Sequence, residues 1–291
     1  MTNEIKDLRL AVLIDAENVP HSSLKAVMEE AAIYGTPTIK RIYGDWTSPN
    51  VGGWKASLLE NAVTPIQQYS YTTGKNSTDS AMIIDAMDIL YEGKTDGFCI
   101  VSSDSDFTRL AVRLREAGMK VIGMGEKKTP VAFRAACDKF IYIEVIRAAG
   151  QSRQKAAQPA KQASKASESK NKGKSGKKSK AAQPEKQETA PAAPTEAEKA
   201  ESMAARKEQG VPEDILKLIV DSVSDLADED GYAFMGELGN LLLKKQPDFD
   251  PRNFGYTKLT QLIRALGRFE IDARVIDATK TRHIYLRDKE A

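Results

Sequence analysis

The sequence has few of the residues that most often carry catalysis or hold a metal. It contains two cysteines and two histidines among 291 residues. Cys99 and Cys137 lie in or beside apolar runs without the spacing of a zinc site, so we expect buried free thiols in a reducing cytoplasm. His21 and His283 fall in different segments, which argues against a histidine pair that works as acid and base.

Long apolar runs and a strong net charge are also missing. No stretch approaches the ~20 apolar residues of a membrane helix, and the opening MTNEIKDLRL has no signal pattern. We therefore expect a cytoplasmic protein without membrane contact. With 43 basic and 41 acidic residues, the net charge of +2 does not by itself indicate a nucleic-acid-binding protein.

Three motifs of common enzyme classes are absent as well. There is no Walker A loop of the form GxxxxGK[ST], and no GxGxxG follows the first apolar run. There is also no G-x-S-x-G elbow with a supporting histidine. These absences argue against a P-loop enzyme, a dinucleotide cofactor and a serine hydrolase.

The first half of the chain alternates short apolar runs with amphipathic stretches. The strand-like runs are 8–15, 37–45, 64–71, 97–103, 120–125 and 139–146, and the helical patterns lie near 20–34, 52–61, 78–92, 105–117 and 130–137. This alternation predicts an α/β domain over residues 1–148, with a Rossmann-like parallel sheet covered on both faces. The runs 8–15 and 97–103 are the most apolar, so we expect them at the centre of the sheet.

Residues 149–208 have a different composition. They contain no aromatic residue and almost no branched aliphatic residue, which predicts a disordered linker. The part from Arg153 to Lys180 is basic, with Glu168 as its only acid, and the part from Glu185 is mixed to acidic. A solvated tether and a basic arm that contacts phosphates are both compatible with this pattern.

Residues 209–291 predict a second, smaller folded domain. Helical patterns cover 212–227, 233–246 and 252–266, and the first of these begins with Pro212 and acidic residues. Residues 269–277 and 282–288 alternate like a two-stranded hairpin. Three helices and a terminal hairpin indicate a winged-helix-like α+β domain.

Four aspartates occupy positions that should meet in space. Asp15 ends the first strand, and Asp104 and Asp106 follow the fourth in VSSDSDF. Carboxyl ends of adjacent parallel strands form the crevice where ligands bind. Asp79 lies in the first turn of a helix, on its core-facing side, and should reach the same place. Each aspartate alone is more simply explained as a cap or turn residue, whereas all four together favour a site.

Other acids receive weaker assignments. Asp45 ends RIYGDW and could also approach the crevice, while Asp85 and Asp88 fall away from the core face and are expected to be exposed or to support the site.

Electrostatics suggests what such a cluster would hold. Two unit charges 4 Å apart repel by roughly 4 kcal/mol at an effective dielectric near 20. Several clustered carboxylates would therefore cost an amount comparable to the whole stability of a domain, about 5–15 kcal/mol. Either some of these carboxylates are protonated or a cation neutralises them, and ligation by oxygen alone suits Mg²⁺ or Mn²⁺.

The same motifs resemble a known family. VLIDAENV, RIYGDW, GKNSTDSAMIIDAM and VSSDSDF, in this order over about residues 8–146, are similar to the NYN domain of the PIN-like nucleases. The resemblance implies a metal-dependent ribonuclease whose catalytic and metal-binding acids are Asp15, Asp79, Asp104 and Asp106. It also implies that Asn18 partners the first acid and that Lys75 approaches the RNA phosphates. Arg109, Lys40 and Arg41 are further candidates for phosphate contacts.

The C-terminal domain resembles the OST-HTH, or LOTUS, domain through PRNFGYTKLTQLIRAL. That resemblance implies binding of RNA or of a protein partner, and the residues leave both open, as they leave open a homodimer. The candidate RNA contacts are Arg252, Tyr256, Lys258, Arg264 and Arg268, whereas Phe254, Leu259, Leu262 and Ile263 are expected in the core.

The preferred function is therefore an RNA endonuclease dependent on Mg²⁺ or Mn²⁺, with a C-terminal RNA-binding module. Two alternatives stay open. The first is a non-catalytic RNA-binding or regulatory scaffold, and the second, weaker one is a phosphatase or a nuclease for DNA.

Overall fold

The computed structural model describes residues 7–47, 53–69, 77–156, 211–276 and 281–290. Lys75, residues 70–71 of the expected third strand and residues 157–208 of the expected linker lie outside these ranges. The described residues up to Gln151 and from Val211 belong to one compact unit.

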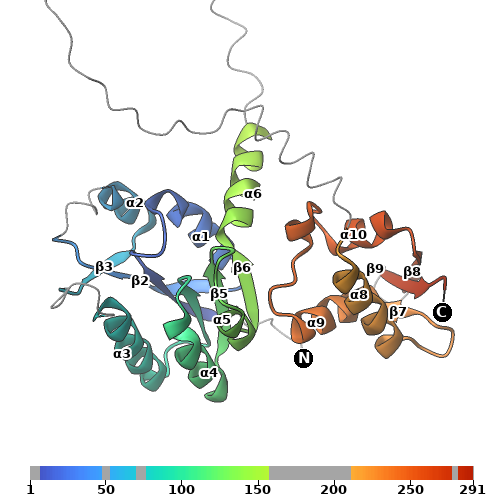
Figure 1. The fold of residues 1–291 in the computed structure, drawn as a ribbon, viewed down its shortest axis with the longest axis horizontal. Helices are drawn as coiled ribbons and strands as arrows, with labels where there is room; N and C mark the ends of the chain where they lie inside the picture. The colour runs from blue at the N-terminus through green and yellow to red at the C-terminus, as the bar shows by residue number, and fades with distance from the viewer. Residues whose placement is uncertain (1–6, 48–52, 70–76, 157–210, 277–280, 291) are drawn as a thin grey trace, which may run out of the picture. The chain divides into compact units, whose positions relative to one another are not determined.

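A parallel sheet of six strands forms the first domain (Figure 1). Its order is β3-β2-β1-β4-β5-β6, and every neighbouring pair is parallel. The strands are β1 (Arg9–Asp15), β2 (Thr36–Gly44), β3 (Thr64–Gln67), β4 (Gly97–Val101), β5 (Lys120–Gly125) and β6 (Lys139–Tyr142). The two most apolar strands, β1 and β4, pair directly at the centre, as predicted.

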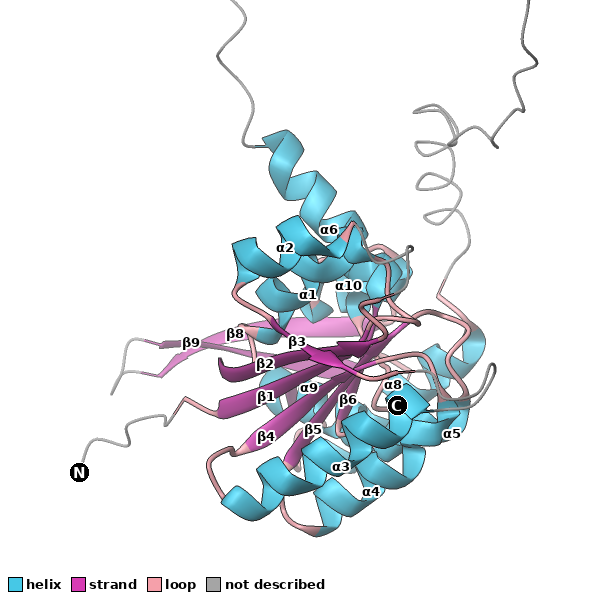
Figure 2. Ribbon diagram, turned by 90° about the vertical axis from the view of Figure 1, so that its left-hand side faces the viewer, coloured by secondary structure: helices cyan, strands magenta, loops and turns pink. Residues whose placement is uncertain are grey.

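Helices cover both faces of this sheet (Figure 2). One face carries α1 (Leu24–Ala31), α2 (Trp54–Asn61) and α6 (Ile143–Ala156), and the other carries α3 (Ser77–Glu92), α4 (Thr108–Glu116) and α5 (Val131–Ala136). Alternate residues of a strand point to opposite faces. Val12 of β1 accordingly packs in the core beneath α1, and Leu13 packs in the core beneath α3.

The end of the first domain differs from the sequence prediction. The expected strand 139–146 stops at Tyr142, and a helix, α6, begins at Ile143. Ile143 and Ile146 are three residues apart and both bury in the same core cluster, a spacing that suits a helix. The helix continues to Ala156, into the range that composition assigned to the linker.

The second domain is a small α+β unit. Its elements are α8 (Glu213–Leu226), β7 (Ala233–Phe234), α9 (Met235–Lys245), α10 (Leu259–Leu266), β8 (Phe269–Ile276) and β9 (Thr281–Asp288). The sheet order is β7-β9-β8, so a short third strand joins the predicted hairpin. Leu262 and Ile263 are fully buried, and Phe254 and Leu259 pack against them, which confirms the expected core.

The predicted helix 252–266 is split in two. Residues 251–254 form a short 3-10 helix, η4, and α10 starts at Leu259. Gly255 between them has φ of +83°, a left-handed conformation that glycine adopts without strain and that ends a helix.

Two further sequence expectations concern the state of the cysteines and the presence of membrane helices. Both thiols are free and buried, and burial raises the pKa of Cys137 to about 12. Across the described residues, no helix has the length and apolar character needed to cross a membrane.

Candidate functional site

The site lies where the winding of the sheet reverses. The chain leaves β1 towards α1 on one face and leaves β4 towards α4 on the other, and β1 and β4 are neighbours. In such sheets the crevice beyond the carboxyl ends of the two strands is the usual place for a ligand. Asp15 is the last residue of β1, and Ser102 to Asp106 directly follow β4.

Asp15 is buried and held by four hydrogen bonds. Its Oδ1 accepts from the backbone N–H groups of Glu17 at 2.9 Å and Asn18 at 3.3 Å. Its Oδ2 accepts from the Asn18 Nδ2 at 2.7 Å and the Ser102 hydroxyl at 2.9 Å. Burial raises the pKa of Asp15, and the hydrogen bonds from Asn18, Ser102 and Glu17 counteract that rise.

Asn18 therefore lies beside Asp15, where the motif placed it, but Ser102 was not predicted. The signal for Ser102 was available, because a serine directly after β4 must lie at the end of the neighbouring β1.

Asp104 and Asp106 form the turn that follows β4. The Asp104 Oδ1 accepts a hydrogen bond from the backbone N–H of Asp106 at 2.9 Å and so caps the short 3-10 helix η3, Ser105–Phe107. The Asp104 N–H in turn donates to the Ser102 Oγ at 3.1 Å. The capping explanation for Asp104 is thus confirmed, and it leaves the second carboxylate oxygen of Asp104 for other contacts.

Asp79 shows most directly that these acids share one environment. It lies in the first turn of α3, and its pKa is raised to about 7. Burial is the largest cause, followed by the negative charges of Asp15, Asp104, Asp106 and Glu17. Asp79 is therefore close enough to the other three predicted aspartates to be affected by their charges, and the roles of all four stay a prediction.

Glu17 is a fifth acid that the sequence reasoning passed over. Its Oε1 accepts a hydrogen bond from the Thr78 hydroxyl at 2.7 Å, which links the turn after β1 to the start of α3. The sequence signal was its position two residues after Asp15, in a turn at the same end of the sheet.

The donors suit a hard cation, but their arrangement is not a finished metal site. Among the residues that the structure describes, no three His, Cys, Asp or Glu side chains form a group that could hold a metal ion. The four acceptor positions of Asp15 are taken by protein donors, so a direct bond from Asp15 to a cation requires one of them to open. Asp79, Asp104 and Asp106 supply carboxylate oxygens, which Mg²⁺ and Mn²⁺ prefer.

The other acids near this end of the sheet serve local structure. The Asp45 Oδ1 accepts from the Thr47 hydroxyl at 2.6 Å and the Gln67 Nε2 at 2.9 Å, which fixes the turn after β2. Asp88 is exposed on α3, as expected. Asp85 is not exposed, however, because it accepts hydrogen bonds from Arg41 and from the Tyr43 hydroxyl and so ties α3 to β2.

The predicted phosphate contacts differ in their availability. Arg109 is exposed on α4, close after the turn of Asp104 and Asp106. Arg41 is engaged with Asp85, and the Lys40 Nζ donates to the Asn61 carbonyl at 2.7 Å, so both have structural partners. Lys75 lies outside the described residues.

In the second domain, two of the candidate RNA contacts are already used in ion pairs. Arg268 pairs with Asp288, and Arg252 pairs with Glu30 and Asp250. Lys258 and Arg264 are exposed, and Tyr256 packs against the core.

The chain thus folds into an α/β domain with several acidic residues at the carboxyl ends of β1 and β4, followed by a small domain of helices and a three-stranded sheet. Residues 9–144 match the family model of the NYN domain, and residues 209–280 match that of the OST-HTH/LOTUS domain. The chain thus joins an NYN domain, which belongs to the PIN-like nuclease superfamily, to an OST-HTH/LOTUS domain.

Two solved structures are similar to parts of the chain. A crystal structure of a Vibrio parahaemolyticus protein of unknown function is 19% identical, covers 49% of this chain and 96% of its own, and has a TM-score of 0.41. A solution structure of an uncharacterised Nitrosomonas europaea protein is 36% identical, covers 25% of this chain and 70% of its own, and has a TM-score of 0.24. No curated protein matches the chain. Neither protein has an assigned activity.

Proposed function

We propose that the protein is a metal-dependent RNA endonuclease that hydrolyses phosphodiester bonds at the crevice between β1 and β4. Asp15, Asp79, Asp104 and Asp106 are its catalytic acids. The NYN domain supports the reaction class, since it belongs to a nuclease superfamily, and the OST-HTH/LOTUS domain supports RNA as the substrate. The observation that carries the site is the pKa of Asp79, raised to about 7 by burial and by the charges of the other three aspartates and Glu17.

In this mechanism Asp79, Asp104 and Asp106 would hold Mg²⁺ or Mn²⁺, with Asp15 joining them when one of its hydrogen bonds opens. The bound ion would activate a water and stabilise the charge on the leaving oxygen. Asn18 and Ser102 hold Asp15 in one orientation through hydrogen bonds of 2.7 and 2.9 Å. Cleavage of this kind leaves a 5′-phosphate and a 3′-hydroxyl, and it needs no histidine pair.

Substrate binding in this proposal falls to residues at the rim of the crevice. Asn18 offers a side-chain amide for hydrogen bonding. Arg109 is an exposed cation in the first turn of α4, three residues after Asp106. Lys75 is the third proposed contact. A basic segment from Arg153 to Lys180 would add salt-sensitive affinity, about 0.7 logarithmic units per phosphate neutralised on a single strand.

A second candidate function is a non-catalytic RNA-binding scaffold. The specific observation in its favour is Asp15, whose carboxylate is fully used by protein hydrogen bonds, together with the lack of a finished metal-binding group among the described residues.

The test compares the wild-type protein with Asp104→Asn on labelled single-stranded RNA, with Mg²⁺, with Mn²⁺ and with EDTA. Asparagine also caps helices, so the turn after β4 should survive the change. We expect the wild type to cleave only with a metal and the variant to lose more than about a hundredfold in rate. Asp88→Asn is the matched control, because Asp88 is an exposed aspartate on α3 and should leave the rate unchanged.

Each other outcome has a definite meaning. Equal cleavage by wild type and Asp104→Asn would remove the site assignment. If neither protein cleaves any of several RNAs, yet both shift RNA on a gel, the scaffold is the better description. Cleavage of a matching DNA at a similar rate would replace RNA with DNA as the substrate.

A further inference from the structure

The open edge of the first domain's sheet is met by a segment of the second domain. β6 is the last strand in the sheet order, so its outer backbone groups have no strand partner within the described sheet. The Phe140 N–H on that edge donates to the Pro247 carbonyl at 2.9 Å. Proline has no N–H of its own, so Pro247 accepts this hydrogen bond but cannot extend the ladder. The contact covers an edge that proteins otherwise protect against unwanted pairing.

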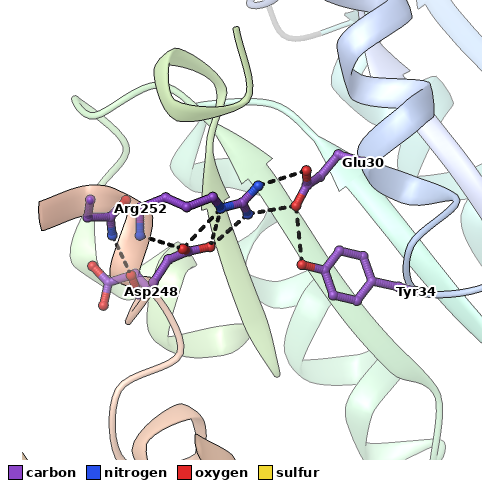
Figure 3. Close-up of polar contacts among 6 residues, drawn as sticks. Glu30, Tyr34, Asp248 and Arg252 are labelled. Atoms are coloured by element: carbon purple, nitrogen blue, oxygen red, sulfur yellow. Dashed lines mark hydrogen bonds and ion pairs between the residues drawn. The ribbon is translucent and has the colours of Figure 1, made fainter. Parts of the chain in front are cut away.

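Arg252, five residues after Pro247, joins the two domains through a largely buried ion pair (Figure 3). The Arg252 Nη1 and Nη2 donate to the two carboxylate oxygens of Glu30 on α1, at 2.9 and 2.7 Å. Its Nε and Nη2 also donate to Asp250, at 2.7–3.0 Å. The Arg252 guanidinium thus bridges Asp250 in its own domain and Glu30 in the first domain. Its contact with Glu30 is bidentate, a geometry that makes such ion pairs strong.

A second polar contact lies next to it. The Asp248 Oδ2 accepts hydrogen bonds from Arg134 of α5 and from the Tyr142 hydroxyl at the end of β6, the latter at 2.7 Å. Arg134 also donates to the Tyr142 hydroxyl at 2.6 Å, so the three groups form a closed triangle. Residues 247–252 therefore contact the first domain through one backbone group and two acidic or basic side chains.

The burial of these charges indicates a built contact. The side chain of Glu30 is 6% exposed and that of Asp250 is 8% exposed, while Arg252 is 23% exposed. Within its own domain, the Glu30 carboxylate accepts a hydrogen bond from the Tyr34 hydroxyl at 3.3 Å. A carboxylate this buried needs a cation, and removing one partner of a buried pair is strongly destabilising. Arg252 forms a direct ion pair with Glu30, while Lys139 of β6 adds a second positive charge nearby without an ion-pair contact among the described residues.

We propose that the OST-HTH/LOTUS domain docks on the β6 edge of its own chain's NYN domain through residues 247–252, with Arg252 and Asp248 as its anchors. The sequence alone predicts a linker between the two domains and gives no signal for this contact. Residues 157–210 join α6 to the second domain, and a connection within one chain keeps the two domains at an effective concentration that can reach roughly millimolar. A modest contact is saturated at such a concentration, which favours docking within one chain over docking between two.

Docking at this place leaves the acidic crevice out of the contact. Glu30 lies in the last turn of α1, and α1 starts beyond the carboxyl end of β1, so Glu30 is near the opposite end of the sheet. Tyr142, the partner of Asp248, ends β6, which is separated from β4 by β5 in the sheet order. None of the anchors is an acid of the proposed active site. The inference is therefore independent of the proposed nuclease function, and each can fail without the other.

Hydrogen exchange in the intact full-length chain tests the docking. The Phe140 amide should be protected in the wild type, because the hydrogen bond to Pro247 closes it. In Arg252→Ala and in Arg134→Ala, one variant on each side of the contact, we expect Phe140 to exchange at least tenfold faster. Amides of β1 and β4 should keep their protection, which shows that the first domain is still folded.

Arg268→Ala is the matched control. Arg268 is 27% exposed and pairs with Asp288, which is 8% exposed, but this ion pair lies wholly inside the second domain. It should leave Phe140 protected. Rapid exchange of Phe140 in the wild type, or unchanged exchange in both interface variants, would overturn the proposal. Native mass measurement at micromolar protein should give the single-chain mass of 31.9 kDa, and a dimer that dissociates in Arg252→Ala would overturn docking within one chain.

Discussion

Among the acids at the carboxyl ends of β1 and β4, Asp79 has the surroundings that most disfavour its ionised form. It lies in the first turn of α3 and is partly buried, and this burial, followed by the charges of four other acids, raises its pKa. Asp15 is different, because the donors around it offset part of the cost of its burial. A cation bound near these acids would therefore stabilise the ionised form of Asp79 more than that of Asp15. Without metal, the cost of ionising Asp79 should make the stability of the protein depend on pH.

Asp79→Asn should remove most of that dependence in EDTA. The folded protein keeps the Asp79 proton up to about pH 7, whereas the unfolded chain releases it near the ordinary value of 3.8. The stability due to protonated Asp79 is thus full below about pH 4 and is lost as the pH rises through 7. A shift of this size corresponds to about 4 kcal/mol before screening, and the partial exposure of Asp79 reduces it to about 1–2 kcal/mol.

Urea unfolding at pH 4 and at pH 8 measures this effect. The variant should match the wild type at pH 4 and be more stable by about 1–2 kcal/mol at pH 8. A variant that is less stable than the wild type at pH 8 would show that the crevice does not strain Asp79.

Helix α3 is held to the sheet at two points along its length. Near its start, Thr78 donates to Glu17, and in its middle, Asp85 accepts from Arg41 and Tyr43 of β2. Burial and the contact with Asp85 raise the pKa of the Tyr43 phenol, so it remains a donor. This second anchor fixes the helix that presents Asp79 to the crevice.

Asp85→Ala should therefore affect both stability and the proposed site. It leaves the Arg41 guanidinium and the Tyr43 hydroxyl without their acceptor, at a cost of about 1–3 kcal/mol. We expect a lower urea midpoint and, if the protein cleaves RNA, a lower rate. Asp88→Ala is the control, as Asp88 lies exposed on the same helix and should change the midpoint by less than about 0.5 kcal/mol. Equal effects of both variants would mean that Asp85 is no anchor.

Features with a local cause in the sequence could be predicted, and features that depend on distant residues could not. Strands β1 and β4 and their acids followed from apolar runs that end at aspartates, which is local information. The partner of Asp85 is 44 positions away and that of Arg252 is 222 positions away, so neither pairing leaves a local trace. The strand expected at 139–146 ends early, at Tyr142, for a related reason: a short apolar run is compatible with a strand or with a buried helical segment until tertiary packing decides.

The whole molecule follows the domain order that the sequence predicted, but its two domains are not independent in the structure. Domains in one chain move separately by default, unless their interface is large or strongly held. Here the interface is held by the ion pair of Arg252 with Glu30, by the contact of Asp248 with Arg134, and by a backbone hydrogen bond to the sheet edge. Coupling of this kind should appear when the protein is heated.

Calorimetry on the full chain should show the two domains unfolding in one transition, since loss of either domain leaves buried charges of the other without partners. Arg252→Ala removes the guanidinium that pairs with Glu30 and Asp250, a loss of about 3–5 kcal/mol for a buried pair. That loss should uncouple the domains and give two transitions, each with a calorimetric enthalpy equal to its van't Hoff enthalpy. Arg268→Ala weakens an ion pair inside the second domain and should shift the Tm while keeping one transition. Two transitions in the wild type would mean that the contact between the domains is too weak to couple their unfolding.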